Sequence, residues 1–329
     1  RDLRVTVEVA TKMVNVEKDP ASPVVEVPIA EWVRAGAYAL QEAYFQLPVS
    51  ARKAWGLGLA GPDGWIALDV GFDPISPLRL TGSVPLEEDL ARWLAVEPRR
   101  SRKVSVILSP KDYFRFAVSG GFAADVTSAS RLGLLEEGAS QWSADRAGEK
   151  NIPVRWLPPV FDAHVTTGRL SEDGMRRTSL PGGFWLVAGA HEAEAAIVAA
   201  GDLRGGKIWV VSRPGAPAIA AYGVPHLAKL SPPDGWRAVR SAMAGHQILE
   251  WEGVAPAPSG IEQGDENNAP SGGEQGGESN APFLTARRAE LEAAGFTVRG
   301  VERAQGAPAA GAAVLAGMGS GLLRGWDHY

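Results

Sequence analysis

Apolar positions along the first third of the chain follow both the two-residue period of a strand and the longer period of a helix. Residues 3–9, LRVTVEV, alternate apolar and polar side chains, which predicts a half-buried opening strand. Residues 29–47 carry apolar side chains at close to helical spacing and are followed by Pro48, and residues 87–95 form a shorter stretch of this kind. The pattern therefore predicts one strand and two helices in this part.

Residues 55–70 have the pattern of a hairpin. Two short apolar runs, Trp55–Leu59 and Trp65–Val70, are joined by the sequence GPDG at residues 61–64. Glycine, proline and aspartate all favour turns, each for a different conformational reason. The pattern predicts two paired strands with a tight connection.

The middle of the chain alternates strands with helices. An apolar run before Pro110 leads into a predicted helix that has Ser109 as its N-cap and stops at the glycine pair 120–121. Between residues 183 and 222 the order is strand, helix, turn and strand. This order predicts α/β architecture.

The last third contains a tract that is almost free of apolar side chains. Residues 255–282 include a tandem duplication, EQGDENNAP followed by EQGGESNAP. This composition predicts a flexible segment, centred on residues 255–280, because it cannot bury enough apolar surface to offset the entropy of ordering. After it we expect a helix at 285–295, a strand at 297–302 and a helix rich in alanine and glycine at 309–323.

Composition excludes several classes of protein. The chain has 329 residues, enough for two domains, and its 45% hydrophobic and 22% charged residues are typical of a folded globular protein. A net charge of -5 without clustered Lys and Arg argues against nucleic-acid binding, and we expect the basic stretch at 99–103 to be a solvated loop. No segment has the roughly 18 apolar residues of a membrane span.

The cysteine and histidine content limits the possible chemistry. The chain has no cysteine, which excludes disulfides and a cysteine nucleophile and favours a reducing compartment, so we expect a cytoplasmic protein. Five histidines without cysteine do not predict a transition-metal site. The first residues lack the apolar core of a secretory signal, and the chain begins with Arg, which leaves open whether residues precede it.

Two stretches in the first half of the chain resemble the FGGY family of carbohydrate kinases, which includes xylulose, ribulose and glycerol kinases. Residues 58–69, GLAGPDGWIALD, are similar to the family's sugar-contacting segment, Gly-x-Ser-Gly-Gln-Met-His-Gly followed by an apolar strand ending in Asp. Residues 110–136, which begin PKDYFRFAVSGG, resemble its Pro-Lys-Asp-Tyr helix, Thr-Gly-Glu turn and Asp-x-Ser-x-Ala-Ser segment. The second of these is the most specific match.

Two further stretches in the second half follow in the family's order. Residues 187–216 resemble the segment that carries the family's catalytic carboxylate, usually Ala-Gly-x-x-Asp, followed by a helix and by a strand that leads to a Gly-Thr-Ser phosphate loop. Residues 276–317 resemble its adenosine-binding loop and terminal Gly-Ala-Ala-x-x-Ala helix. The resemblance implies two ribonuclease-H-like domains of the actin-like ATPase type, at residues 1–178 and 179–329, with sugar and ATP bound in the cleft between them.

The sequence also departs from the family pattern. The opening Asp-x-Gly-Thr turn that cradles ATP phosphates has no counterpart near residues 1–19, and residues 78–93 replace the Trp-x-Asp-x-Arg segment. The phosphate loop reads Ser-Arg-Pro-Gly at 212–215, where Pro214 cannot donate a backbone N–H. Glu192 stands at the position of the catalytic Asp.

The resemblance implies a set of candidate site residues. Glu192 would be the catalytic base, although an acidic residue at a helix start is also favoured by the helix dipole alone. Asp63 and Trp65 would contact the sugar, although Asp is also common in turns for conformational reasons. The candidate nucleotide-binding residues are Ser212, Gly215, Gly276, Gly277 and Ser279.

The resemblance therefore implies phosphoryl transfer from Mg²⁺-ATP to a sugar or polyol hydroxyl, impaired to the extent that the phosphate loops are altered. ATP and Mg²⁺ are implied by the resemblance alone. Two alternatives remain open at this stage: a non-catalytic descendant that binds a sugar or a partner, and a gene product whose fold is only partly stable. The expected partner is a small-molecule sugar or polyol, with no nucleic acid and no membrane.

Overall fold

The computed structural model describes residues 13, 16, 22–52, 56–81, 84–136, 140–199, 207–213, 216–222, 236–243, 246–253, 289, 293, 297–301 and 307–320. Several predictions lie outside the described residues: the strand at 3–9, the flexible tract at 255–280, and nearly all of the helix at 285–295. The same holds for four candidate nucleotide-binding residues, Gly215, Gly276, Gly277 and Ser279.

The chain forms two compact units. The first comprises Arg1–Leu203, Ser241–Gly245 and Gln305–Tyr329, and the second comprises Arg204–Arg240 and His246–Ala304. The described residues 179–199 thus belong to the first unit, so the units divide later along the chain than the predicted domain boundary at 178/179. The assignment of 1–178 and 179–329 to the two family domains stays a prediction.

A four-stranded antiparallel sheet lies at the centre of the first unit, in the order β1-β5-β4-β6. All five residues of β4 are buried, and alternate side chains enter different clusters. Trp65 and Ala67 pack with residues of α2, whereas Ile66 and Leu68 pack with Val27 and the start of α1. Both faces of this sheet are therefore covered by packed side chains. Its strands are β1 (Val25–Val27), β4 (Gly64–Leu68), β5 (Leu78–Leu80) and β6 (Val106–Leu108).

Most of the predicted helices are confirmed. The helix after Ser109 has the expected cap, because the Ser109 side chain accepts a hydrogen bond from the backbone of Asp112, and it ends at Gly120, which has a left-handed φ of 75°. The helices of the first unit are α1 (Ile29–Gln46), α2 (Leu86–Val96), α3 (Pro98–Ser101), α4 (Pro110–Ser119), α5 (Val126–Arg131), α6 (Ala144–Glu149), α7 (Glu172–Thr178), α8 (Glu192–Ala199) and α10 (Ala307–Gly319), with short 3₁₀ turns at Val49–Ala51 and Val154–Trp156.

The predicted hairpin at residues 55–70 is wrong. β2 (Gly56–Leu57) pairs in parallel with β10 (Trp185–Val187), and β3 (Ala60–Gly61) pairs in parallel with β11 (Ala190–His191). β4 pairs instead with β5 and β6 in the central sheet. Residues 61–64 thus connect β3, in one sheet, to β4, in another. This happens because the backbone hydrogen bonds of β2 and β3 are made with β10 and β11.

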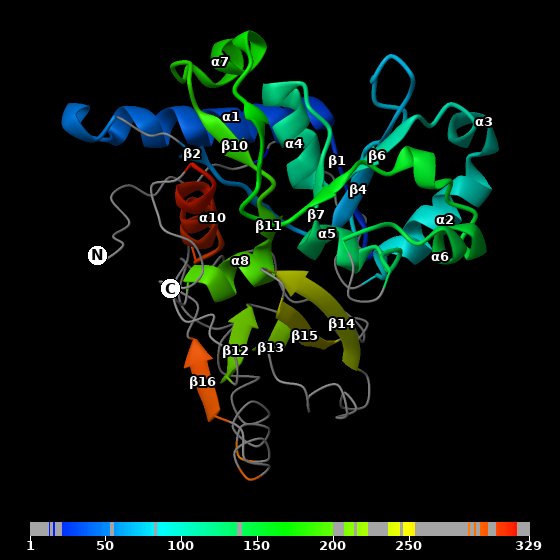
Figure 1. The fold of residues 1–329 in the computed structure, drawn as a ribbon. Coiled ribbons are helices and arrows are strands. Elements are labelled where there is room, and N and C mark those ends of the chain that lie inside the picture. The colour runs from blue at the N-terminus through cyan, green and yellow to red at the C-terminus, as the bar shows by residue number, and fades with distance from the viewer. Residues whose placement is uncertain are drawn as a thin grey trace, which may run out of the picture. The chain divides into compact units, whose positions relative to one another are not determined.

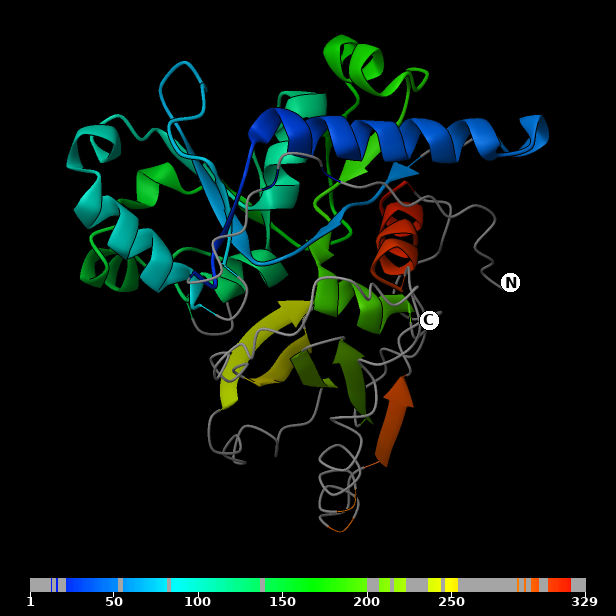
Figure 2. The ribbon, with the colours of Figure 1, turned by 180° about the vertical axis from the view of Figure 1, so that it is seen from behind.

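Glycines allow α10 to lie directly against the strands and helix of this region. A Cβ on Gly58 would overlap the carbonyl oxygen of Ala312, and a Cβ on Gly311 would overlap that of Ala195 in α8. Figure 1 shows α10, in red, beside α8 and β2, and Figure 2 shows the same helix from behind. The final small-residue helix of the sequence is therefore a packing element of the first unit.

The remaining strands complete a mixed α/β architecture, as predicted. In the first unit β9 (Thr166–Arg169) joins β10, and β7 (Ala124–Asp125) pairs with β8 (Val160–Phe161). The second unit is built around a five-stranded sheet in the order β14-β15-β13-β12-β16, with β12 and β16 parallel. Its strands are β12 (Lys207–Arg213), β13 (Ala216–Tyr222), β14 (Trp236–Met243), β15 (His246–Gly253) and β16 (Thr297–Val301). Within the described part of the chain, no helix is both long enough and apolar enough to span a membrane.

Candidate active site

The β3–β11 pairing brings the predicted sugar segment beside the predicted catalytic segment. Ala60 is paired with Ala190, and Gly61 with His191, across about 130 positions of sequence. Helix α8 begins immediately after this pair, with Glu192 as its first residue. The two stretches that carry the family resemblance at 58–69 and 187–216 therefore meet through their backbones.

Glu192 lies at the start of α8 and is half-buried, whereas its neighbours His191 and Ala193 are buried. Its place directly after a strand is where ligand sites of open α/β sheets gather. The structure thus leaves the candidate base accessible at the edge of the buried region.

Asp63 is held from two sides by residues of other segments. Its Oδ2 lies 3.1 Å from Nη1 of Arg131, at the end of α5, and its Oδ1 lies 3.5 Å from Nε2 of His191. The other guanidinium nitrogen of Arg131, Nη2, lies 3.6 Å from Oε2 of Glu194, and that same oxygen lies 3.0 Å from Nδ1 of His191. These four side chains form one charged unit, which we call the Arg131 bracket.

A second charged group joins α4 to the connection between β10 and β11, which precedes the site. Lys111 lies 2.6 Å from Oδ1 of Asp112 and 2.7 Å from Oδ2 of Asp125, and its ammonium also donates to the carbonyl of Ala188 at 3.0 Å. All of these side chains are buried. Lys111 therefore ties the 110–136 stretch to the chain just before Glu192.

Asp125 extends the connection to the site itself. Its carboxylate accepts hydrogen bonds from the backbone of Thr127 and Ser128 as the N-cap of α5, and also from the Thr127 hydroxyl. The Thr127 hydroxyl oxygen in turn accepts a hydrogen bond of 2.7 Å from the backbone N–H of His191. The residue before Glu192 is thus fixed by both its backbone and its ring.

These buried charges were not predicted from the sequence. The signal that could have revealed them is the presence of Lys111, Asp112 and Arg115 within the otherwise apolar run PKDYFRFAV, because charged side chains that are nearly inaccessible need partners from elsewhere in the fold. Arg131 and Glu194 gave no comparable signal, because each lies in a helical sequence where a charged residue is equally compatible with an exposed position.

Trp65 is a residue of the hydrophobic core. The side chain is 1% exposed, and its indole N–H donates to Oδ2 of Asp89 at 3.0 Å. Asp89 also binds Arg79, and this hydrogen bond raises the pKa of Arg79 above its ordinary value. The predicted contact between Trp65 and a sugar stays a prediction.

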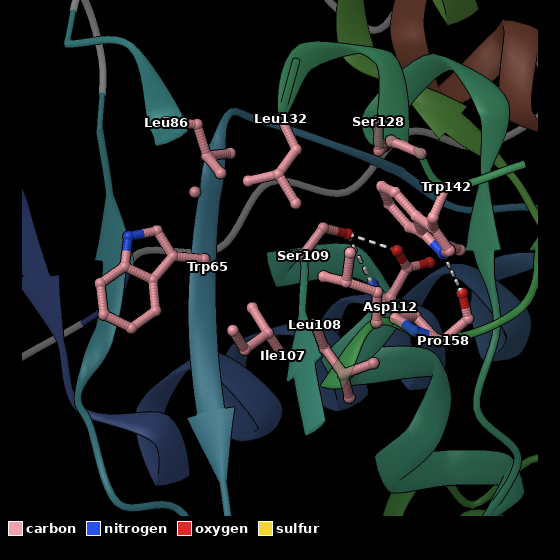
Figure 3. Close-up of a pocket in the computed structure, with 14 residues that line it drawn as sticks. Trp65, Leu86, Ile107, Leu108, Ser109, Asp112, Ser128, Leu132, Trp142 and Pro158 are labelled. Atoms are coloured by element: carbon pink, nitrogen blue, oxygen red, sulfur yellow. Dashed lines mark hydrogen bonds between the residues drawn. The ribbon is translucent and has the colours of Figure 1, made fainter. Parts of the chain in front are cut away.

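A small cavity lies beside the site, lined by Gly64, Ser109, Asp112 and mainly apolar side chains (Figure 3). Ser109 and Asp112 are hydrogen-bonded to each other, and the Trp142 indole donates to the carbonyl of Pro158. Its volume of ≈ 30 Å³ has room for about one water molecule. Ligand pockets are typically about 300–1,000 Å³, so this cavity is not a sugar pocket.

Of the candidate nucleotide-binding residues, only Ser212 lies among the described residues, near the end of β12. Gly215, Gly276, Gly277 and Ser279 lie outside them. Within the described part of the chain, no group of three or more His, Asp or Glu side chains has the arrangement of a metal site. The structure therefore does not test the predicted nucleotide site.

Curated relatives with sequence similarity to this chain include xylulose kinases. The chain is 30% identical over 111 residues to the xylulose kinase of Bacillus subtilis and 28% identical over 116 residues to a probable L-xylulose kinase of Pasteurella multocida. Each match covers 34% of this chain, and 22% and 24% of those proteins. The chain thus matches less than a quarter of the length of these relatives, and no family model matches it.

Solved structures extend the likeness over most of the chain. A xyloylose kinase from Brucella ovis superposes with a TM-score of 0.71 at 16% identity, covering 94% of this chain and 84% of that one. A xylulose kinase from Rhodospirillum rubrum superposes at 0.62 with 17% identity, covering 71% and 53%. The chain is thus similar to FGGY carbohydrate kinases in sequence over about a third of its length and in fold over most of it. A glycerol kinase from Plasmodium falciparum, at a TM-score of 0.59 with 13% identity and covering 73% and 55%, has the same FGGY fold.

Proposed function

We propose that this FGGY homologue is a carbohydrate kinase that transfers the γ-phosphoryl group of ATP to a hydroxyl of a sugar or polyol. The observation that carries the proposal is the β3–β11 pairing, which brings the Asp63 segment beside the start of α8, where Glu192 stands. A kinase needs its base and its acceptor site within reach of one another. The expected cytoplasmic location belongs to the same proposal.

Glu192 would accept the proton of the attacking hydroxyl, and Asp63 would orient a hydroxyl of the same substrate. Phosphoryl transfer depends mainly on such positioning and on neutralising phosphate charge. Mg²⁺-ATP would supply the phosphoryl group and that neutralisation, with Ser212, Gly215, Gly276, Gly277 and Ser279 as the proposed nucleotide-binding residues. Magnesium in such sites is held by one or two carboxylates and the phosphates, so a cage of protein side chains is not required.

The two-domain arrangement is part of the proposal. Residues 1–178 would supply the sugar side and residues 179–329 the nucleotide side, with the acceptor hydroxyl and the γ-phosphate meeting between them. This arrangement excludes water from the transferring group, which limits ATP hydrolysis as a side reaction.

A coupled ADP-release assay over a panel of pentoses, hexoses and polyols tests the function. We expect at least one of these acceptors to stimulate ADP release by the parent protein and not by Glu192→Gln, while Glu149→Gln, on the short surface helix α6, behaves as the parent. If no acceptor stimulates ADP release but one of them raises the melting temperature, the chain is a sugar-binding module and the kinase proposal is wrong.

A further inference from the structure

Arg131 contacts carboxylates from two different segments. One arm of its guanidinium lies 3.1 Å from Asp63, in the turn before β4, and the other lies 3.6 Å from Glu194, in the first turn of α8. The arginine side chain is 1% exposed, and those of Asp63 and Glu194 are 9% and 0% exposed. A single buried cation thus spans the space between the proposed sugar segment and the helix of the proposed base.

We propose that Arg131 is a positioning residue for the substrate, which holds Asp63 at a fixed distance and orientation relative to α8. This inference rests on the proposed kinase function and deepens it, because it names the residue that sets the acceptor side of the site. Arg131 acts through Asp63 and makes no contact with the reacting atoms.

The geometry of Asp63 supports this role. Arg131 engages one of its oxygens, and His191 lies beside the other, so the carboxylate is bounded on both sides. Its orientation is therefore set before a sugar arrives, which lowers the entropy lost on binding.

Arginine suits this position better than lysine does. Its planar guanidinium offers several N–H donors in a fixed fork, so it can bind two carboxylates in one geometry, whereas an ammonium group is a point charge on a flexible stem. Buried ion pairs contribute little net stability, because desolvation offsets much of their attraction. The bracket is thus better explained by the orientation it imposes than by stabilisation of the fold.

The experiment separates these two roles with a charge-balanced variant. Arg131→Met leaves Asp63 and Glu194 without their cation and should lower both the melting temperature and sugar affinity. The double variant Arg131→Met with Glu194→Gln removes one charge of each sign, so we expect it to regain most of the melting temperature while KM for the sugar stays raised about tenfold or more. A rise in KM with kcat nearly unchanged indicates lost substrate binding.

Two further variants complete the design. Arg131→Lys keeps the charge and should recover part of the affinity that Arg131→Met loses. Arg79→Lys is the matched control, because Arg79 also bridges two carboxylates, Asp89 and Glu26, but lies outside the bracket. We expect it to lower stability without raising KM. If KM returns to the parent value together with the melting temperature in the double variant, Arg131 acts on stability alone and the inference is wrong.

If the chain neither phosphorylates nor binds any sugar, the kinase function is refuted. The role of Arg131 in positioning Asp63 is then tested by a measurement that needs no ligand. Hydrogen exchange at the amides of Asp63 and Gly64 reports the order of the turn directly. At matched global stability, faster exchange there in the double variant than in Arg79→Lys supports positioning by Arg131. Equal exchange in both variants would overturn it.

Discussion

Gly311 of α10 and Ala195 of α8 approach so closely that a Cβ on the glycine would overlap the alanine carbonyl oxygen. This contact fixes the last helix of the first unit against the helix that carries Glu192. Gly311→Ala should therefore destabilise the protein by about 1–3 kcal/mol, although alanine favours helices intrinsically. Urea unfolding measures the change.

Gly148, in α6, is the matched control for this substitution. A Cβ there meets no atom within 4 Å, so Gly148→Ala should be neutral or stabilising by up to about 1 kcal/mol. If the two variants unfolded at the same urea concentration, the close packing of α10 on α8 would be wrong.

Lys111 is expected to be essential for stability because it compensates two buried carboxylates, Asp112 and Asp125. Lys111→Met should cost about 3–5 kcal/mol, since removing one partner leaves uncompensated charge in the interior. Adding Asp125→Asn should recover part of that loss. Lys103→Met, at an exposed position, should change the free energy of unfolding by less than about 0.5 kcal/mol. A Lys111→Met protein as stable as the parent would refute the buried network.

The elements with strong local signals could be predicted from the sequence. Helical spacing of apolar residues gave α1 and α2, and the Ser109 cap with the Gly120 stop gave α4. The pairing of β2 and β3 could not be predicted, because two- and three-residue strands carry little pattern and their partners lie about 130 residues away. The chain bends at Asp63, within the predicted turn, but long-range partners decided which sheet each strand joined.

The site, too, could be predicted from the sequence only in part. The family resemblance placed Asp63 and Glu192, and the structure brings their segments together. The Arg131 bracket could not be predicted, because the two carboxylates that Arg131 contacts, Asp63 and Glu194, lie 68 residues before and 63 residues after it in the sequence. The sequence around a charged residue does not show which distant residue will form an ion pair with it.

Trp65 should behave as a core residue. Trp65→Phe removes the indole N–H that binds Asp89 and reduces the contact with Trp93, which lies 5.2 Å away between ring centroids. We expect a loss of about 1–3 kcal/mol in the free energy of unfolding and an unchanged sugar-induced shift in melting temperature. A large loss of sugar affinity at little cost in stability would instead support the sugar contact predicted from the sequence.

Tyr113 should make stability fall at high pH. Burial raises the pKa of its phenol above the ordinary value of 10.0, which outweighs the lowering effect of Arg177, and Asp73 adds to the rise. The folded state thus holds this proton more tightly than the unfolded state, so the contribution is complete below about pH 10 and is lost as the pH rises through the folded-state pKa. Urea unfolding of Tyr113→Phe should show a shallower decline above pH 10, and an identical decline would contradict the assignment.

The role of Glu192 is tested most directly by the rate at which phosphate is transferred to the sugar. Phosphorus NMR can follow formation of the sugar phosphate ester by the parent, Glu192→Gln and Glu192→Asp at saturating ATP. We expect Glu192→Gln to lose ester formation by at least about 10²-fold, as expected for removal of a general base. Glu192→Asp should retain more ester formation than Glu192→Gln, because it keeps a carboxylate, although the shorter side chain moves that carboxylate by about 1 Å. Ester formation by Glu192→Gln at the parent's rate would contradict the central claim.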